Sequence, residues 1–578
     1  MIRQRETVLL DLTLPRTLRS IAERVPAETT AEIWVFDGVA ERRAAEQHGI
    51  RLRPAFKPLV HWLIEERPAD AASIDILYPV VVDVPPERFL REAYPAADLP
   101  HVPPITFAPL PPARYEATPP AYRAQTTLRD GTVRSAAIPA PNRWRQDASG
   151  ERCLAPAGWL RLRSAESGAV VEDRPFPTDL EQAFAAFEAA LAEIAVPDDP
   201  EVLIFEQFHV TLTCGAADRP LGVGSEGLRL TEALEEDLYF TALEHFRRRR
   251  GTGPQDRSAI VGQIVPEVRV AAPGADLHLT VATRPPPRLR PAAALDGPLP
   301  QDAIAAALDA LGGQPFGTTS RQGRPVQGRG FGTDPGNAAM ISAGQHGNEP
   351  TGIVGALRAA ETLLASGERD LALCPLENPD GHALYLSAFA RAPEHMHHAG
   401  RFTAAGNDIG QGTGVEEEVH RTARRQAGGL LHISLHGYPA HEWVRPMTGY
   451  LPAGYAEWML PRGFMLILRT TAAHKPLAEA ILQAAARAAT LDPAIRALNA
   501  TEIARARRYG VAIPRTIAGA PVFAKVVEDG RWPITLITEA PDESVSGPRF
   551  ALLAAAQARA AVAAVGALRN FDPDAVAG

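Results

Sequence analysis

The chain has 578 residues, of which 46% are hydrophobic and 22% charged, and this is the composition of an ordinary globular protein. Its length allows about two to four domains. The formal net charge of -9 leaves no basic footprint, so nucleic acid is not an expected partner.

The cysteines and the apolar stretches indicate in which cellular compartment the protein is expected. Cys153, Cys214 and Cys374 are too few and too far apart for a disulfide framework, which favours a reducing, cytoplasmic location. The first residues are charged and lead into an apolar stretch too short for a signal peptide. No run of ~18 apolar residues is uninterrupted, so no membrane span is expected. Residues 550–568 are predicted to form an amphipathic helix packed on the protein.

Proline clusters at residues 100–120 and 285–300 divide the chain into three parts. We expect an amino-terminal α/β region at 1–120 and a middle α+β region at 121–290. Neither gathers a catalytic set of residues, so both have unknown roles. The expected elements are strands at 31–36, 74–83, 202–205, 210–213 and 277–281, and helices at 179–194 and 230–250.

The carboxyl-terminal part, residues 298–570, alternates helical and strand patterns. Such alternation predicts an α/β fold: a mixed, mostly parallel sheet with helices on both faces, preceded by the smaller α/β or α+β regions. The expected elements are helices at 303–311, 351–364 and 477–489, and strands at 338–342, 371–375, 430–438 and 532–540.

The only His-x-x-Glu in the chain, His346 and Glu349, lies between an expected strand and an expected helix. This spacing lets an imidazole and a carboxylate reach one metal ion from a single turn of backbone. Borderline cations such as Zn²⁺ accept both kinds of ligand. The pair is therefore a candidate half of a metal site.

Two later strands end in residues that could complete the site. His436 lies at the carboxyl end of one, where open α/β sheets form ligand sites. His432 shares its strand face, but the strand-end position before a glycine favours His436. Glu539 ends the second strand, and Asp542 and Glu543 just beyond it are weaker candidates. Two His, one Glu and an open fourth position form the ligand set of a hydrolytic zinc site.

The ordered set His346-Gly-Asn-Glu349, Asn378-Pro-Asp-Gly381, His436 and Thr538-Glu539 resembles the zinc carboxypeptidase superfamily, meaning the M14 metallopeptidases and the aspartoacylase-like deacylases. The resemblance is confined to the carboxyl-terminal part. It implies one zinc ion per chain bound by His346, Glu349 and His436. It also implies that Glu539 is the carboxylate that transfers protons. The Asn-Pro-Asp-Gly sequence is expected to be a structural turn.

The segment from residue 391 to 411 departs from the family. The resemblance implies an arginine that stabilises the oxyanion, and Arg401 is the candidate, with Arg391 behind it. It also implies an Asn-Arg pair that binds the substrate's terminal carboxylate. Asn407 fits the asparagine, but Asp408 stands where the arginine is expected, and its carboxylate would repel another.

Two further features near this segment leave alternatives open. The His-rich run 395–398 could contact substrate or bind a second metal, but a solvated loop is expected. Tyr438 and Tyr450 are both possible phenolic donors, and spacing does not choose between them.

The sequence thus predicts a hydrolase of the metallocarboxypeptidase type, a zinc metalloprotease that cleaves an amide bond in a peptide or acylated amino acid. Glu539 would take a proton from a zinc-activated water and pass it to the leaving nitrogen, and Arg401 would assist. One alternative is an amidase or deacylase that needs no free terminal carboxylate. Another is a catalytically inactive binding protein that retains the pocket.

Overall fold

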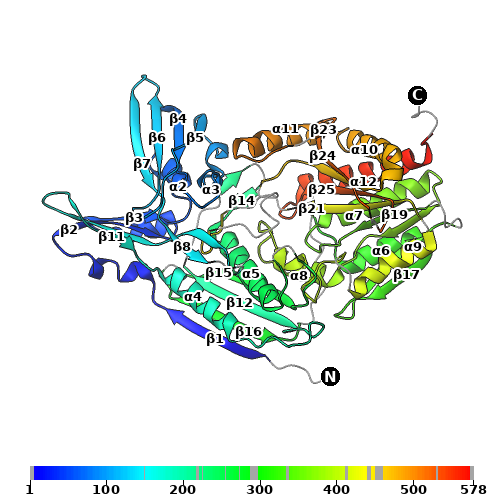
Figure 1. Cartoon of the computed structure of the whole chain (residues 1–578), viewed down its shortest axis with the longest axis horizontal. Coiled ribbons are helices and arrows are strands. Elements are labelled where there is room, and N and C mark those ends of the chain that lie inside the picture. Colours follow the sequence, from blue (N-terminus) through cyan, green and yellow to red (C-terminus); the bar gives the residue numbers. More distant parts are fainter. Residues whose placement is uncertain are drawn as a thin grey trace.

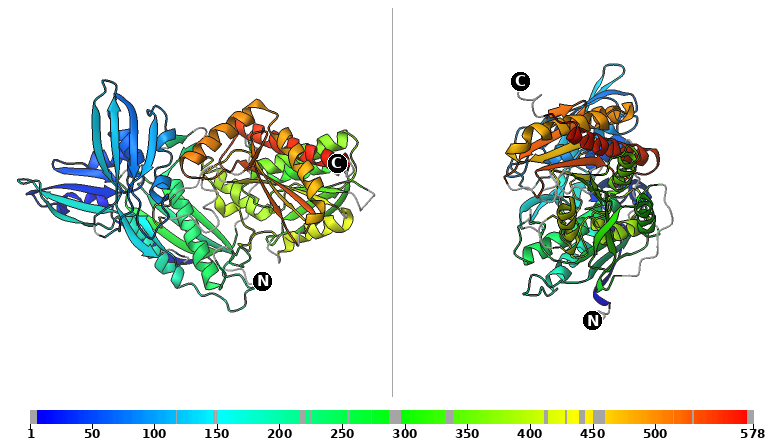
Figure 2. Two further views of the ribbon diagram at one scale, coloured as in Figure 1. Left: turned by 45° about the horizontal axis from the view of Figure 1, so that its top comes forward. Right: turned by 90° about the vertical axis from the view of Figure 1, so that its right-hand side faces the viewer.

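The computed structural model describes residues 6–572, except 117, 147, 149, 216–220, 224–225, 254–255, 273, 287–296, 333–337, 411–413, 428, 439–443, 450–459, 514 and 529–530. In Figure 1 the amino-terminal and middle parts, blue to green, lie beside the carboxyl-terminal part, green to red. Figure 2 shows the same side-by-side arrangement after a rotation about the horizontal axis.

A nine-stranded sheet forms the centre of the carboxyl-terminal part, in the order β17-β18-β20-β19-β21-β25-β22-β24-β23. Four strand pairings are parallel and four antiparallel, so the sheet is evenly mixed and the prediction of a mostly parallel sheet is not confirmed. Two of the antiparallel pairs, β17–β18 and β23–β24, are hairpins at the two edges, and the other two, β18–β20 and β22–β25, join strands that are not consecutive in the chain. The strands are β17 Gln314–Thr319, β18 Pro325–Gly330, β19 Ala339–Ala343, β20 Leu371–Cys374, β21 Leu431–Tyr438, β22 Met465–Thr470, β23 Arg515–Ile517, β24 Ala520–Val526 and β25 Ile534–Pro541.

Helices cover both faces of this sheet, as predicted. On one face α12 contacts both α7 and α10, and all three contact the strands, while α9 contacts β17, β18, β19 and β20 on the other face. Alternate residues of β21, namely Leu431, Ile433 and Leu435, belong to the core on the α7 side, so the residues between them face the opposite side. The helices are α6 Gln301–Leu311, α7 Pro350–Ala365, α8 Pro379–Phe389, α9 Glu418–Ala427, α10 Lys475–Ala489, α11 Pro493–Arg508 and α12 Gly547–Arg569.

Within the described part of the chain, α12 is the one helix long and apolar enough to cross a membrane by length and composition. It packs against α7 and α10, and its alanines belong to the core of the carboxyl-terminal part. This is the packed helix expected at residues 550–568.

The first two parts of the chain share their sheets. Three four-stranded sheets have the orders β1-β16-β12-β15, β11-β10-β2-β3 and β5-β4-β6-β7, beside the pairs β8-β9 and β13-β14. The pairing of β4 with β6 joins residues on both sides of the boundary expected at 120. The strands are β1 Thr7–Leu14, β2 Thr29–Val35, β3 Ile50–Pro54, β4 Ala71–Tyr78, β5 Ile105–Pro109, β6 Ala121–Leu128, β7 Val133–Pro139, β8 Asn142–Gln146, β9 Arg152–Pro156, β10 Trp159–Ser164, β11 Val170–Pro175, β12 Gln207–Cys214, β13 Leu221–Val223, β14 Glu226–Leu228, β15 Gln263–Val270 and β16 Leu277–Arg284.

The helices α1 to α5 accompany these sheets, and both expected long ones are present as α4 and α5. The strand predicted at 202–205 is wrong: these residues form an irregular segment with bends at Val202 and Ile204, because so short an apolar run does not distinguish a strand from a loop. The helices are α1 Val39–Ala45, α2 Pro58–Glu65, α3 Arg88–Glu92, α4 Asp179–Ala192 and α5 Leu230–Arg249.

Acidic side chains of α5 connect the middle part to the His-rich run. Glu236 pairs with the Nδ1 atom of His398, and Glu235 lies 3.5 Å from that of His395. His395, His397 and His398 are all buried. The solvated loop predicted for residues 395–398 is therefore wrong, because these imidazoles lie inside the protein beside carboxylates of another part of the chain.

Candidate metal centre

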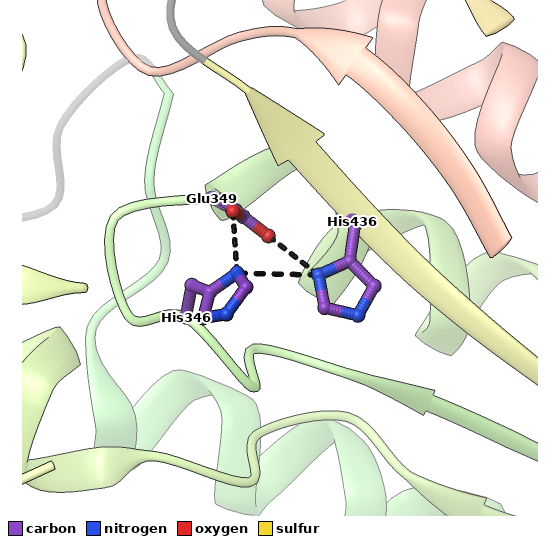
Figure 3. A group of neighbouring side chains, drawn as sticks. All are labelled: His346, Glu349 and His436. Atoms are coloured by element: carbon purple, nitrogen blue, oxygen red, sulfur yellow. Dashed lines mark hydrogen bonds and ion pairs between the residues drawn. The ribbon is translucent and has the colours of Figure 1, made fainter. Parts of the chain in front are cut away.

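Three side chains from separate elements converge at the carboxyl end of the sheet (Figure 3). His346 follows β19, Glu349 lies at the start of α7, and His436 lies near the end of β21. Glu349 bridges the imidazoles: its Oε1 lies 2.6 Å from His346 Nδ1, and its Oε2 lies 2.9 Å from His436 Nδ1. All three residues are buried, and their ligand atoms lie within 4.8 Å of one another.

The donor set fits a zinc ion. Two nitrogens bound to one tetrahedral Zn²⁺ at ~2.0–2.1 Å lie ~3.3–3.4 Å apart. The two Nδ1 atoms of His346 and His436 are separated by 3.3 Å. Two imidazole nitrogens and a carboxylate are also the ligand types that Zn²⁺ prefers in hydrolytic sites. The residues present therefore suit the metal that the sequence implies.

A carboxylate behind His346 fixes the orientation of its ring. The Nε2 atom of His346 lies 3.2 Å from Asp408 Oδ1, which leaves Nδ1 free to face His436 and Glu349. Carboxylate partners of this kind hold a metal-binding imidazole in the correct tautomer. Burial alone would raise the pKa of Asp408, but His346, Arg401 and Arg257 hold that pKa below its ordinary value.

This contact corrects the expectation for Asp408. Its carboxylate does not face the substrate as a lone repelling charge, because His346 and the Gln345 amide, 3.1 Å from Oδ1, both engage it. The sequence placed Asp408 by its neighbour Asn407, whose own side chain bonds to Thr403. Spacing from an asparagine could not reveal that the aspartate reaches a histidine 62 residues earlier.

The middle part of the chain holds Asp408 in place. The backbone N–H groups of Val261 and Gly262 donate to the carbonyl of Ala405, and that of Asp408 donates to the carbonyl of Arg257. The Arg257 guanidinium also lies 3.7 Å from Asp408 Oδ2. No sequence signal marked residues 257–262, since apart from the Arg257 guanidinium they act on the site through backbone contacts.

Glu349 carries further hydrogen bonds besides those to the two imidazoles. The N–H of Gly437 donates to its Oε2 over 3.0 Å, and Arg401 Nη1 donates to its Oε1 over 3.1 Å. Burial would raise the pKa of Glu349, yet the imidazoles of His346 and His436 hold that pKa below its ordinary value. Arg401, the candidate oxyanion donor, thus binds one of the three candidate metal ligands.

Glu539 lies beside the metal ligands because of strand register. In the parallel ladder between β21 and β25, His436 is directly opposite Glu539. Neighbouring strands lie ~4.8 Å apart, so the two side chains rise together from one face of the sheet. Burial, reinforced by the nearby Glu349 carboxylate, raises the pKa of Glu539 well above its ordinary value.

A pocket of about 520 Å³ opens over these residues. Its walls include His346, Glu349, His436, Glu539 and Arg401, and it extends along the sheet away from the metal ligands. An amide substrate placed there would have its carbonyl near the ligand set and near a carboxylate able to move protons.

The rival candidates lie elsewhere. His432 bonds to Ser342 Oγ over 2.9 Å, deeper along the pocket than His436. Asp542 accepts from the N–H of Thr351 over 2.9 Å and so caps α7, while Glu543 lies buried 3.9 Å from His398.

Three further residues named from the sequence are accounted for. Arg391 lies near Glu267, outside the pocket lining. The Asn378 side chain accepts from the N–H of Gly381, so the predicted turn is the start of α8. Tyr438 lines the pocket and donates to the carbonyl of Gly463, while Tyr450 lies outside the described residues.

No family model matches the chain, and no curated protein matches its sequence. Part of the chain is similar to solved metallo-carboxypeptidase structures. The interpretation as a metal site depends on the side-chain geometry described above. The matches include a metallo-carboxypeptidase from Burkholderia cenocepacia (14% identity, 51% of this chain and 73% of that chain, TM-score 0.29), a metallo-carboxypeptidase from Pseudomonas aeruginosa in complex with (2-guanidinoethylmercapto)succinic acid (14%, 52% and 76%, 0.27) and bovine thrombin-activatable fibrinolysis inhibitor in complex with tick carboxypeptidase inhibitor (12%, 47% and 96%, 0.28).

Proposed function

We propose that this protein is a zinc-dependent hydrolase that cleaves an amide bond in a peptide or an acylated amino acid. The observation that carries the proposal is the convergence of His346, Glu349 and His436, with Glu539 on the neighbouring strand of the same pocket. Glu539 is buried there with no direct ion pair among the described residues, although the charges of Arg401 and Arg469 act on it, so its carboxylate is available to move protons.

His346, Glu349 and His436 would hold the ion, and zinc, when bound, supplies an activated water and polarises the amide carbonyl. Glu539 accepts the proton of the attacking water and delivers it to the leaving nitrogen. Its burial and raised pKa suit this exchange, because a carboxyl group of low pKa would hold the proton too weakly to donate it.

Arg401 and Asp408 support this chemistry in different ways. Arg401 contributes a fixed positive charge where the oxyanion forms, and such donors act most strongly in a water-poor site. Asp408 keeps the His346 ring turned toward the ion. Because Asp408 is engaged by His346, its charge no longer favours an amidase or deacylase over a peptidase.

The test is a Glu539→Gln variant, which keeps the shape of the side chain but cannot accept a proton. We expect it to bind zinc like the wild type and to lose hydrolysis of acylated dipeptides by about 10²–10⁴-fold, the range for a general base. Glu361→Gln, at an exposed position of α7, is the matched control and should keep full activity. Undiminished hydrolysis by the Glu539 variant would overturn the proposal.

A further inference from the structure

Side chains from three neighbouring strands form the floor of the pocket. In β21, β25 and β22 the residues that face the pocket fall into rungs set by strand register. The first rung holds His436 and Glu539. The second holds Ser434, Ile537 and Ile467, and the third holds His432, Thr535 and Arg469.

The regular spacing of these rungs fixes how far each one lies from the catalytic residues. Successive rungs are two residues apart, so the third lies ~13 Å from the catalytic rung between Cα atoms. A group bound on the floor would therefore have its reacting end at Glu539, a short apolar stretch over Ile467 and Ile537, and its far end near Arg469.

Arg469 differs from the other arginines that line the pocket in having no carboxylate paired with it among the described residues. Arg401 pairs with Glu349, Arg257 with Asp408, and Arg531 with Glu417. Among the described residues, no hydrogen bond or ion pair engages the Arg469 guanidinium, which is exposed at the pocket wall. Its charge acts on Glu539 through space, but no carboxylate of the described residues binds it directly, so it is available to an anion at the far end of the floor.

A second observation on the same floor indicates a missing ligand. The hydroxyl of Ser434, on the middle rung, is buried and has no hydrogen-bond partner. A buried hydroxyl normally finds a partner, and this one is directed at the pocket. A polar atom of a bound substrate would satisfy it.

We propose that Arg469 is a specificity-determining residue that selects substrates bearing a carboxylate on the group bound over this floor. This inference rests on the proposed hydrolase function and names its substrate class. The carboxylate has two possible sources, the free carboxyl end of a peptide or an acidic side chain. Its bond to Arg469 would fix the register of the substrate, so that the scissile amide lies at Glu539.

The test compares acylated dipeptides, acyl-Phe-Glu, acyl-Phe-Gln and acyl-Phe-Lys, each with a free and an amidated carboxyl end. We expect Arg469→Gln to lower kcat/KM about tenfold to a hundredfold for compounds that carry the recognised carboxylate, the range for a hydrogen bond to a charged group. A lower kcat/KM for every peptide with a free carboxyl end identifies the terminal carboxylate as the group that Arg469 binds. A lower kcat/KM for the two Glu compounds alone identifies the glutamate side chain as that group.

If the side chain is the source, Arg469→Glu should prefer the Lys compound to the Glu compound; if the terminal carboxylate is the source, it should disfavour every compound with a free carboxyl end. Arg358→Gln, at an exposed position of α7 on the opposite side of the sheet, is the matched control and should change nothing. An equal effect of Arg469→Gln on charged and neutral compounds would overturn the proposal.

A binding measurement separates this inference from the proposed function. Zinc-loaded Glu539→Gln protein is titrated with the same peptides in a calorimeter, which requires no turnover. We expect the carboxylate-bearing compounds to bind about tenfold to a hundredfold more weakly when Arg469→Gln is added. If no peptide is hydrolysed but this difference in Kd is found, the hydrolase proposal fails and the anion site stands. Unchanged Kd values contradict the anion site.

Discussion

The contact between Asp408 and His346 makes a sharp prediction about metal affinity. In an Asp408→Asn variant the side chain keeps its shape but loses its charge. Its oxygen can still accept from His346 Nε2, at 3.2 Å in the native protein, but as a neutral acceptor. Hydrogen bonds to charged groups contribute about 1.5–3 kcal/mol and neutral ones about 0.5–1.5 kcal/mol.

The difference of about 1–1.5 kcal/mol corresponds to roughly a tenfold loss of zinc affinity. That value is at the lower end of the 10–100-fold loss typical of carboxylates behind metal-binding histidines. Competition with a chromophoric zinc chelator at fixed pH measures it. Asp309→Asn removes an exposed carboxylate that pairs with Arg329, and should leave zinc affinity unchanged. Equal affinities of the Asp408 variant and the wild type would refute the role given to this contact.

Two further variants test how the fold supports the site and how burial sets stability. Gly406 has φ +79°, and a Cβ there would lie 2.5 Å from the carbonyl oxygen of Gly262. Gly406→Ala should therefore lower the free energy of unfolding by more than the ~1–3 kcal/mol of backbone strain, and it should weaken zinc binding by moving Asp408. Gly519→Ala, at φ +87° with open space around it, is the control for strain alone, and equal losses of stability in thermal unfolding would contradict the argument. Burial lowers the pKa of Lys57 from 10.5 to about 7. The unfolded chain therefore binds more protons between these values, and the free energy of unfolding rises with pH by up to about 1.4 kcal/mol per unit. Denaturant unfolding should show Lys57→Met most stabilising relative to wild type at pH 7 and less so toward pH 10, whereas a constant difference contradicts the shift.

Much of the carboxyl-terminal part could be predicted because its strands and helices have strong local patterns. The strands that end in His436 and Glu539 are apolar runs closed by turn residues, and His346 and Glu349 are close in sequence. Those local signals were enough to bring the candidate ligands to one edge of the sheet. The antiparallel edge strands were missed because their hairpins carry few apolar residues and pair at the edges.

The remaining features depend on contacts between distant segments. The role of Asp408 is set by the fold of its own loop and by residues 257–262, and the burial of the His-rich run is set by the acidic face of α5. The periodicity of one segment carries no information about which charges a distant segment will place against it. The same holds for Arg469, whose position in the pocket follows from the register of β22 against β25.

The most direct test of the central claim is the zinc content of the purified protein. After loading with zinc and dialysis, elemental analysis should find about one zinc per chain, bound by His346, Glu349 and His436. His346→Ala should lose that zinc, and His48→Ala, at an exposed position of the amino-terminal part, should retain it. A wild-type chain without zinc, or a His346→Ala variant that holds as much as the wild type, would contradict the metal site.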